Sequence, residues 1–492
     1  MTRSAAPHDV AQTEPILRSG QTCWRQVPAD RFALIVDAED YFAALKVAMT
    51  RAEKTIFLVG WDFDFRIRLN PGSRDKTWPD KLGALLTALV KRKPDLEIRL
   101  LKWDLSILST LARGSTPLFM LGWLAQPRVH LCLDHAHPLG ACHHQKIVVI
   151  DDAFAFCGGI DATVGRWDTR AHRGKDKRRD SEWGFAQGPW HDATAAVDGG
   201  AAEALGFLAR DRWRLATGET LPPPEPPPQP GHDVWPPMLK PDLTNVMIAI
   251  ARTQPHYEGQ RAAHEIETQY LAAIGAARRS IYIESQYCAS RKIGEALARR
   301  LQEKDGPEVV IVTPKSADGW LEEKVMGAAR VLVVGMLRDS DRDDRFRIYY
   351  PVAADGTPIY VHAKIMIVDD RFLKIGSSNL NNRSMGFDTE CDLAIEASDR
   401  AEDRRVRAVI AGITTDLLAE HLGVDPQVIA AARHANGTLI DVIGKFARPR
   451  GRTLKPLKLR DLDEAEKQLA ETQILDPERP ARLVPKLKRL FR

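Results

Sequence analysis

Residues 142–152, CHHQKIVVIDD, place two histidines and a lysine directly before four branched apolar residues. β-Branched residues fit a pleated sheet, and a short unbroken apolar run is typical of a strand covered on both faces, so we expect a buried strand over 147–150. Because side chains two positions apart lie on one face of a strand, His144 and Lys146 should emerge together at its start. Asp151 should lie on the other face or past the end of the strand.

The same pattern returns in VHAKIMIVDD, residues 361–370, where His362, Lys364 and Asp369 repeat the spacing His-x-Lys-x-x-x-x-Asp. The second histidine follows the first at an offset of 218. A chance likeness between two α/β segments would not keep polar identities at a fixed offset. We therefore interpret the chain as an internal duplication.

The offset extends to other polar residues of the two halves. Asp161 in CGGIDATVG falls on Asn379 in IGSSNLNNRS when the same offset is applied. Further along, DSEWGFA from Asp180 matches DTECDLA from Asp388 at an offset of 208. This alignment predicts ten extra residues in the first half, within GRWDTRAHRGKDKRR.

Helical patterns alternate with these strands. DAEDYFAALKVAMTRA begins at Asp37, a favourable capping residue, and spaces its apolar residues three and four apart. We predict an α/β fold, a two-lobed pseudo-symmetric α/β sandwich with mixed sheets and one active site between the lobes. The proline-dense stretch TLPPPEPPPQPGHDVWPP suits neither a helix interior nor a central strand. The predicted organisation is a first lobe at 1–219, a proline-rich linker at 220–240, a second lobe at 241–440 and a basic C-terminal tail at 441–492.

The composition excludes several classes of protein. The chain is 44% hydrophobic and 28% charged, with 70 Lys and Arg against 66 Asp and Glu, a surplus too small to argue for nucleic acid. No apolar run reaches the length of a membrane span and the N-terminus lacks the apolar stretch of a secretory signal, so we expect a cytoplasmic protein. The six cysteines form no CxxC pair and favour reduced core thiols, and CLDHAHPLGACHH, residues 132–144, matches no common zinc spacing.

Two histidines and two lysines set against buried strands are costly to desolvate unless a ligand compensates. If the lobes face one cleft, these groups suit an anion with charge on several oxygens, such as a phosphodiester. One neutral imidazole can attack phosphorus and form a phosphohistidine, while the other, protonated, donates to the leaving oxygen. The lysines would stabilise charge on the equatorial oxygens, and without a carboxylate cluster of metal-binding spacing we expect no cofactor and no catalytic metal.

Polar residues near the two motifs are candidates for supporting roles. A nucleophilic imidazole needs a partner on its other nitrogen, and Glu182 and Glu390, equivalent in the alignment above, are predicted to orient the histidines. Asp161 and Asn379 either bond a phosphate oxygen or a lysine, Asp161 suiting the lysine, or only stabilise their turns. Ser377, in the GSSN turn, adds a candidate hydroxyl.

These motifs resemble the phospholipase D superfamily over about residues 37–396. The resemblance implies the fold, the phosphohistidine route and metal independence. The family's nucleophile and acid fall on the two motif histidines, and we assign the nucleophile to His144. The catalytic set implied is His144, Lys146, Asp151, His362, Lys364 and Asp369, supported by Glu182 and Glu390.

A narrower likeness lies in GGIDATVGRWDT, residues 158–169. It is similar to the signature that follows the first motif in eukaryotic-type, phosphatidylcholine-cleaving members of the superfamily. The substrate-binding set implied is Asp161, Ser377, Asn379, Arg166, Trp167 and Asp168.

The resemblance implies a phospholipase D that hydrolyses phosphatidylcholine or a similar glycerophospholipid to phosphatidic acid, with transphosphatidylation where an alcohol replaces water. A cardiolipin-synthase-like phosphatidyltransferase, a metal-independent nuclease and a non-catalytic lipid-binding relative remain alternatives. The expected partner is a phospholipid at a membrane surface, and nucleic acid is disfavoured. The segments 444–460 and 481–492 contain basic but no acidic residues. They either attract an anionic bilayer on the inner membrane face or wrap back over the lobes.

Overall fold

The fold is seen in a computed structural model of the chain, which describes residues 14–74, 76–104, 126–180, 186–225, 232–317, 323–398, 403–435, 437–464, 466 and 476–477. The predictions made for Glu182 and for the segment 481–492 lie outside the described residues. Among the described residues, no helix is both long enough and apolar enough to cross a membrane.

The strands are β1 (Arg25–Val36), β2 (Thr55–Gly60), β3 (Glu97–Trp103), β4 (Val129–Asp134), β5 (Ile147–Ile150), β6 (Phe154–Gly158), β7 (Trp190–His191), β8 (Ala193–Asp198), β9 (Leu243–Gln254), β10 (Ala263–His264), β11 (Ser280–Glu284), β12 (Glu308–Val312), β13 (Phe346–Val352), β14 (Tyr360–Val361), β15 (Ile365–Val368), β16 (Phe372–Gly376), β17 (Glu390–Glu396) and β18 (Thr453–Pro456). The helices are α1 (Ala38–Arg51), α2 (Leu82–Arg92), α5 (Gly200–Thr217), α6 (Glu265–Ala276), α7 (Arg291–Gln302), α9 (Ala328–Ser340), α10 (Asn382–Gly386), α11 (Arg404–Leu422), α12 (Pro426–His434) and α13 (Leu439–Phe446).

One 16-stranded mixed sheet runs through the molecule, with the antiparallel pair β1–β9 at its centre. Outward from that pair, the first half continues β8, β6, β5, β2, β3, β4 and the second half continues β17, β16, β15, β11, β12, β13. The equivalent strands occupy equivalent positions, and β18 adds an edge strand to the second half. The predicted α/β fold with a duplicated, pseudo-symmetric architecture is confirmed, and the two lobes share a single sheet.

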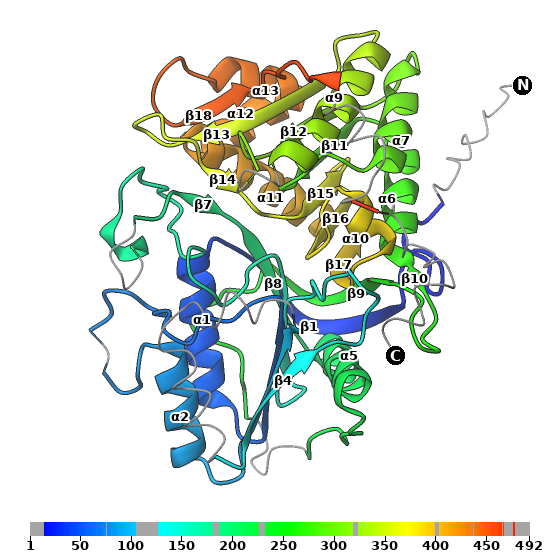
Figure 1. The fold of residues 1–492 in the computed structure, drawn as a ribbon. Helices are drawn as coiled ribbons and strands as arrows, with labels where there is room; N and C mark the ends of the chain where they lie inside the picture. The colour runs from blue at the N-terminus through cyan, green and yellow to red at the C-terminus, as the bar shows by residue number, and fades with distance from the viewer. Residues whose placement is uncertain are drawn as a thin grey trace, which may run out of the picture.

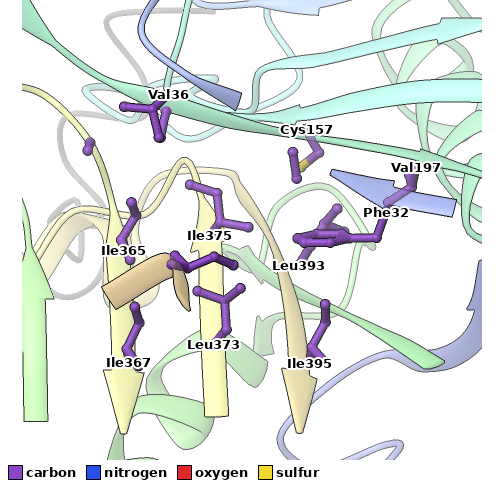
Figure 2. Packing of buried hydrophobic residues seen from close by; sticks show 14 of the residues in the cluster. Phe32, Val36, Cys157, Val197, Ile365, Ile367, Leu373, Ile375, Leu393 and Ile395 are labelled. Carbon is purple, nitrogen blue, oxygen red and sulfur yellow. The ribbon is translucent and has the colours of Figure 1, made fainter. Parts of the chain in front are cut away.

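Helices cover both halves of the sheet, as Figure 1 shows with the first half below and the second above. One core cluster joins α1 and α2 to the strands of the first half, and another joins α6, α7 and α9 to those of the second. A third cluster belongs to both halves. In it Phe32 and Cys157 face Ile375, Leu393 and other residues of the second half (Figure 2). Ile147 and Ile365, the first residues of β5 and β15, both belong to this shared core. Burial of the core therefore holds the starts of the two motif strands in one part of the molecule.

The C-terminal segment extends the second half of the sheet. The boundary expected at residue 441 falls inside α13, and Thr453–Pro456 pairs with β13 as β18. In the proline-rich segment, Trp235 is 4% exposed and packs in the core of the first half.

Strand register corrects one part of the alignment between the halves. Gly158 and Gly376 end β6 and β16, and they lie opposite Thr194 and Asp392 respectively. The offset between β8 and β17 is therefore smaller by twenty than the offset between the two motifs. The predicted match of DSEWGFA with DTECDLA is wrong, and the first half carries twenty extra residues before β8 rather than ten. The likeness of these two segments is local, whereas the strand that corresponds to β17 is β8, which follows the insertion.

Candidate functional site

Each duplicated motif is joined through its backbone to a segment of the opposite half. The N–H of His144 donates to the carbonyl of Thr389 (3.0 Å), and the N–H of His362 donates to the carbonyl of His191 (2.7 Å). Around these bonds β7 pairs with β14 in parallel, and an isolated parallel bridge joins His143 to Thr389. The residue after each bridging segment, Asp192 or Glu390, therefore lies beside the histidine of the other half.

His144 is oriented by Glu390. Its Nδ1 lies 3.0 Å from both carboxylate oxygens of Glu390, which is fully buried. The hydroxyls of Ser377 (2.5 Å) and Ser384 (2.7 Å) donate to the same carboxylate. Burial raises the pKa of Glu390 to about 8, opposed by Lys146 and by these two hydroxyls. Ser377 thus supports the carboxylate, and its role as a substrate contact stays a prediction.

His362 is oriented by Asp192, a residue that the sequence analysis missed. Its Nδ1 lies 2.6 Å from Asp192 Oδ2, while Asp192 Oδ1 accepts the N–H of Ala193 at 2.8 Å. A Cβ added to Gly159 would come within 2.2 Å of Asp192 Oδ1, so only glycine fits there. Gly159 occupies the place of Ser377, since the offset between them equals that between His144 and His362.

Asp192 could have been found from the sequence. In both halves an acidic residue stands two positions before the residue that pairs with the last glycine of the preceding strand. Aligning the apolar strand that follows PWHD with the strand that follows DTE would have matched Asp192 to Glu390. Glu182, predicted for this role, lies outside the described residues.

The two lysines have different neighbours. Lys146 Nζ lies 3.2 Å from Asp161 Oδ2 and donates to the carbonyl of His144 at 3.0 Å. Asp161 Oδ1 also accepts the N–H of Trp61 at 3.1 Å. Lys364 donates to the carbonyl of His362, and the residue equivalent to Asp161 in its half is the neutral amide Asn379. Burial lowers the pKa of Lys364 to about 7.

Electrostatic repulsion links the two motifs. Burial and then Lys146 and Lys364 hold the pKa of His144 well below its usual value. Burial, then Lys364, Arg166, Lys146 and His144, hold the pKa of His362 well below its usual value. Each imidazole therefore feels a basic group of the other half. A bound anion would relieve this repulsion, because its charge is opposite to that of the surrounding lysines.

The two motif aspartates do not belong to this group. Asp151 accepts the backbone N–H groups of Glu53, Lys54 and Thr55 at 2.7–2.8 Å. Asp369 accepts those of residues 278–280 at 2.7–2.8 Å. Both lie past the far end of the strand from the histidine, so their predicted catalytic role is corrected to a structural one: they fix the helix–strand turn of their half.

The predicted substrate contacts in GRWDT divide into one residue beside the site and two inside the fold. The guanidinium of Arg166 lies 4.1 Å from the ring centroid of Trp190, whose ring is 5.2 Å from that of His362. Trp167 is 7% exposed and packs in the core of the first half. Asp168 is fully buried, where its carboxylate accepts hydrogen bonds from within the protein. Trp167 and Asp168 are therefore corrected from substrate contacts to structural residues.

Asn379 is a predicted site residue with unused hydrogen-bonding capacity. It is 4% exposed, and its Oδ1 has no hydrogen-bond partner in the part of the chain that the structure describes. Its backbone N–H donates to Ser384 Oγ at 3.1 Å. Asn379 lies in the turn after β16, at the position that corresponds to Asp161 after β6.

Comparison with known proteins agrees with this arrangement. A family profile described as "Cardiolipin synthase, PLD-like domain" matches residues 270–407. Phospholipase D A of Dictyostelium discoideum is 27% identical over 468 residues, covering 80% of this chain and 36% of that protein. Phospholipase D1 of Schizosaccharomyces pombe is 22% identical over 532 residues, covering 83% and 37%. The chain thus spans little more than a third of the length of these two relatives.

Among solved structures, the phosphatidylserine synthase of Haemophilus influenzae Rd KW20 has a similar fold. The TM-score is 0.52 at 13% sequence identity, over 91% of this chain and 94% of that chain. At this identity the likeness extends to the fold alone.

Proposed function

The chain belongs to the phospholipase D superfamily, and from this premise we propose that it is a phospholipase D acting on a glycerophospholipid such as phosphatidylcholine. The observation that carries the proposal is the crossed pairing of two histidines, one partly exposed and one buried, with carboxylates of the opposite halves: His144 with Glu390 and His362 with Asp192. A pair of oriented imidazoles is what a two-step displacement at phosphorus needs.

In the first step, His144 Nε2 attacks phosphorus and the bond from phosphorus to the headgroup oxygen breaks. His362 Nε2 gives its proton to that oxygen, so the free headgroup alcohol leaves. Glu390, on Nδ1 of His144, stabilises the positive charge that the phosphohistidine ring acquires. Asp192 does the same for His362 when it is protonated. The anionic substrate favours that protonation because it offsets the repulsion from the lysines.

In the second step, water attacks phosphorus and the P–N bond breaks. His362 accepts the proton of that water, and phosphatidic acid leaves with His144 restored. An alcohol in place of water gives transphosphatidylation by the same route. Lys146 and Lys364 stabilise the charge on the equatorial oxygens throughout.

His144 suits the nucleophile better than His362 does. The side chain of His144 is 17% exposed, whereas that of His362 is 6% exposed. A phosphorus atom at the surface of a lipid aggregate reaches the more open imidazole first. The substrate lies in a bilayer, so the reaction takes place at a membrane surface, and we place it on the cytoplasmic side.

A phosphatidyltransferase of the cardiolipin-synthase type is the second candidate. Its support is the description of the profile that matches residues 270–407. The same two histidines would serve, with a phospholipid hydroxyl as the second nucleophile. Lipid products separate the two candidates.

The test presents the purified chain with vesicles of phosphatidylcholine, vesicles of phosphatidylglycerol and single-stranded DNA, with EDTA added at the start of each assay. We expect release of choline and phosphatidic acid from the first vesicles, and none from the His362→Ala variant. Formation of cardiolipin from phosphatidylglycerol with no release of choline would favour the transferase. Cleavage of the DNA alone would overturn the assignment to lipids.

A further inference from the structure

We propose that Asp476 is a positioning residue of the active site, which fixes α10 and, through α10, the carboxylate that orients His144. Asp476 lies 94 residues beyond Asn382, the first residue of α10, in the segment that the sequence analysis predicted to be a basic tail. This role rests on the proposed function, because its first readout is the rate of phospholipid cleavage.

Asp476 is buried against the start of α10. The residue is 3% exposed. Its Oδ2 accepts the N–H of Asn382 at 3.0 Å, and its Oδ1 accepts the N–H of Arg383 at 2.9 Å. Nδ2 of Asn382 also donates to the carbonyl of Asp476 at 3.3 Å. The side chain and the backbone of Asp476 are therefore both bound to this turn.

These contacts supply what a short helix lacks. The first N–H groups of a helix have no acceptor within the helix itself. In α10 the side chain of Asn381 accepts the N–H of Ser384 at 3.1 Å, and Asp476 accepts the two N–H groups before it. A helix of five residues is not stable in isolation, so its position depends on contacts of this kind.

The first connection from α10 to the site runs through Ser384. This residue is 1% exposed, and its hydroxyl donates to Glu390 Oε1 at 2.7 Å. Its Oγ accepts the N–H of Asn379 at 3.1 Å. Glu390 in turn lies 3.0 Å from Nδ1 of His144. A shift of α10 would therefore move the carboxylate that fixes the tautomer of the nucleophile.

The second connection runs through Arg383. Its guanidinium donates to both carboxylate oxygens of Asp388, at 2.7 and 3.0 Å. Asp388 Oδ1 also accepts the N–H of Cys142 at 2.7 Å, two residues before His144. The turn that Asp476 holds is thus linked to the backbone that leads to His144 as well as to the carboxylate that orients its ring.

The alternative is that Asp476 stabilises α10 without any effect on the chemistry. Removal of its carboxylate would then lower the free energy of unfolding but leave kcat of the folded chain unchanged. The contacts favour the positioning role because the N–H groups that Asp476 accepts belong to Asn382 and Arg383, and Ser384 is the next residue of the same turn.

The test compares rates of headgroup release by full-length variants. Asp476→Asn offers one acceptor oxygen for two N–H donors, and it should lower kcat about tenfold while KM stays within about twofold of wild type. Adding Asp476→Asn to Ser384→Ala should lower kcat no further than the larger single effect, because both changes act on Glu390. Asp463→Asn is the matched control, since it removes an exposed carboxylate that accepts the N–H of Glu466, and it should keep wild-type kcat. Circular dichroism checks that each variant is folded.

A second measurement needs no variant. The amide hydrogens of Asn382 and Arg383 have no acceptor within α10, so their slow exchange with deuterium in the wild type reports the contact with Asp476. We expect both to be protected, as read by mass spectrometry with fragmentation to single residues. Fast exchange of both would overturn the positioning role, whether or not the variants fold.

Two kinetic outcomes contradict different claims. Wild-type turnover with unchanged kcat in folded Asp476→Asn, or with effects of Asp476→Asn and Ser384→Ala that multiply, would overturn the positioning role alone. A wild-type chain that cleaves no phospholipid would overturn the proposed function, and this role with it.

Discussion

The two histidines of the site come from duplicated motifs, but their surroundings have diverged. The carboxylate that orients His144 belongs to Glu390 and accepts hydrogen bonds from two serine hydroxyls. The carboxylate that orients His362 belongs to Asp192 and accepts the backbone N–H of Ala193. In the second half, Ser377 donates a hydrogen bond to Glu390. At the equivalent position of the first half stands Gly159, where a Cβ would clash with Asp192 Oδ1. Each half has therefore kept the hydrogen bond while changing the way it is supported.

The lysines differ in the same manner. Lys146 has the carboxylate of Asp161 at 3.2 Å, whereas Lys364 has the amide Asn379 at the equivalent position. The first half contains a neutralised lysine beside the more exposed histidine. The second contains a lysine whose pKa is lowered by burial beside the less exposed one. We infer that the duplication has separated a nucleophile half from an acid–base half, and the following predictions test that difference.

The largest effect is expected from removing either histidine. His144→Ala and His362→Ala should each lower kcat by about 10⁴-fold or more, because the two steps need both groups. The double variant should lose little more, since groups that act as a unit are not additive. Rates of choline release measure this. Full activity in either single variant would remove the two-histidine mechanism.

The next largest effect tests the crossed carboxylates. Glu390→Gln and Asp192→Asn should each reduce kcat by about 10²–10⁴-fold, because an amide no longer fixes the tautomer or stabilises the imidazolium. If the halves have separate roles, Glu390→Gln should mainly slow the first step, in which the phosphohistidine forms and the headgroup leaves. Asp192→Asn should also slow the second step, in which His362 accepts the proton of the attacking water, so that the phosphohistidine accumulates. Acid-quench trapping of the phosphoenzyme distinguishes these steps. Identical effects on both steps would contradict the division of roles.

The pH dependence should depend on Lys364. With a pKa near 7 this amine is charged below that pH and neutral above it, so phosphate binding should weaken as the pH rises through 7. The profile of kcat/KM should therefore fall on its alkaline side with an apparent pKa near 7. Lys364→Arg should move that fall to higher pH, because arginine stays protonated. Lys146→Arg is the control, and an equal shift in both variants would remove the distinction between the lysines.

A smaller effect is expected from the hydroxyl behind Glu390. Ser377→Ala should lower activity about tenfold and stability by about 1–2 kcal/mol, because a buried carboxylate loses a donor. Ser384→Ala should do the same. Urea unfolding and steady-state kinetics measure the two quantities. Wild-type activity in both variants would show that the hydroxyls do not position Glu390.

The smallest effect on turnover is expected at the motif aspartates. Asp151→Asn and Asp369→Asn should each cost about 1–3 kcal/mol of stability, since each carboxylate accepts three backbone N–H groups. Their kcat should stay within about twofold of wild type while the chain is folded. A loss of kcat comparable to that of the histidine variants would return these aspartates to the site.

The fold and half of the site were accessible from the sequence because they rest on local pattern. Residues 147–150 form the buried strand that their β-branched side chains predict, and Glu390 stands at the start of an apolar strand. Asp192 was missed because a long insertion precedes it, and because DSEWGFA, which lies before Asp192, resembles DTECDLA of the second half. The turn-fixing role of Asp151 and Asp369 depends on left-handed backbones, φ 53° and 54°, that sequence spacing does not reveal. Asp37 was predicted as a helix cap, but its side chain makes no capping hydrogen bond. It lies instead beside His172 and His191, which come from segments distant in the sequence.

The central claim is that both imidazoles act on one phosphorus. The most direct test is a crystal structure of the chain with vanadate, which mimics the pentavalent phosphorus of the displacement. We predict one vanadate per chain, bonded to Nε2 of His144 and hydrogen-bonded to Nε2 of His362 from the opposite side. Two vanadates in separate cavities, each beside one histidine, would contradict it.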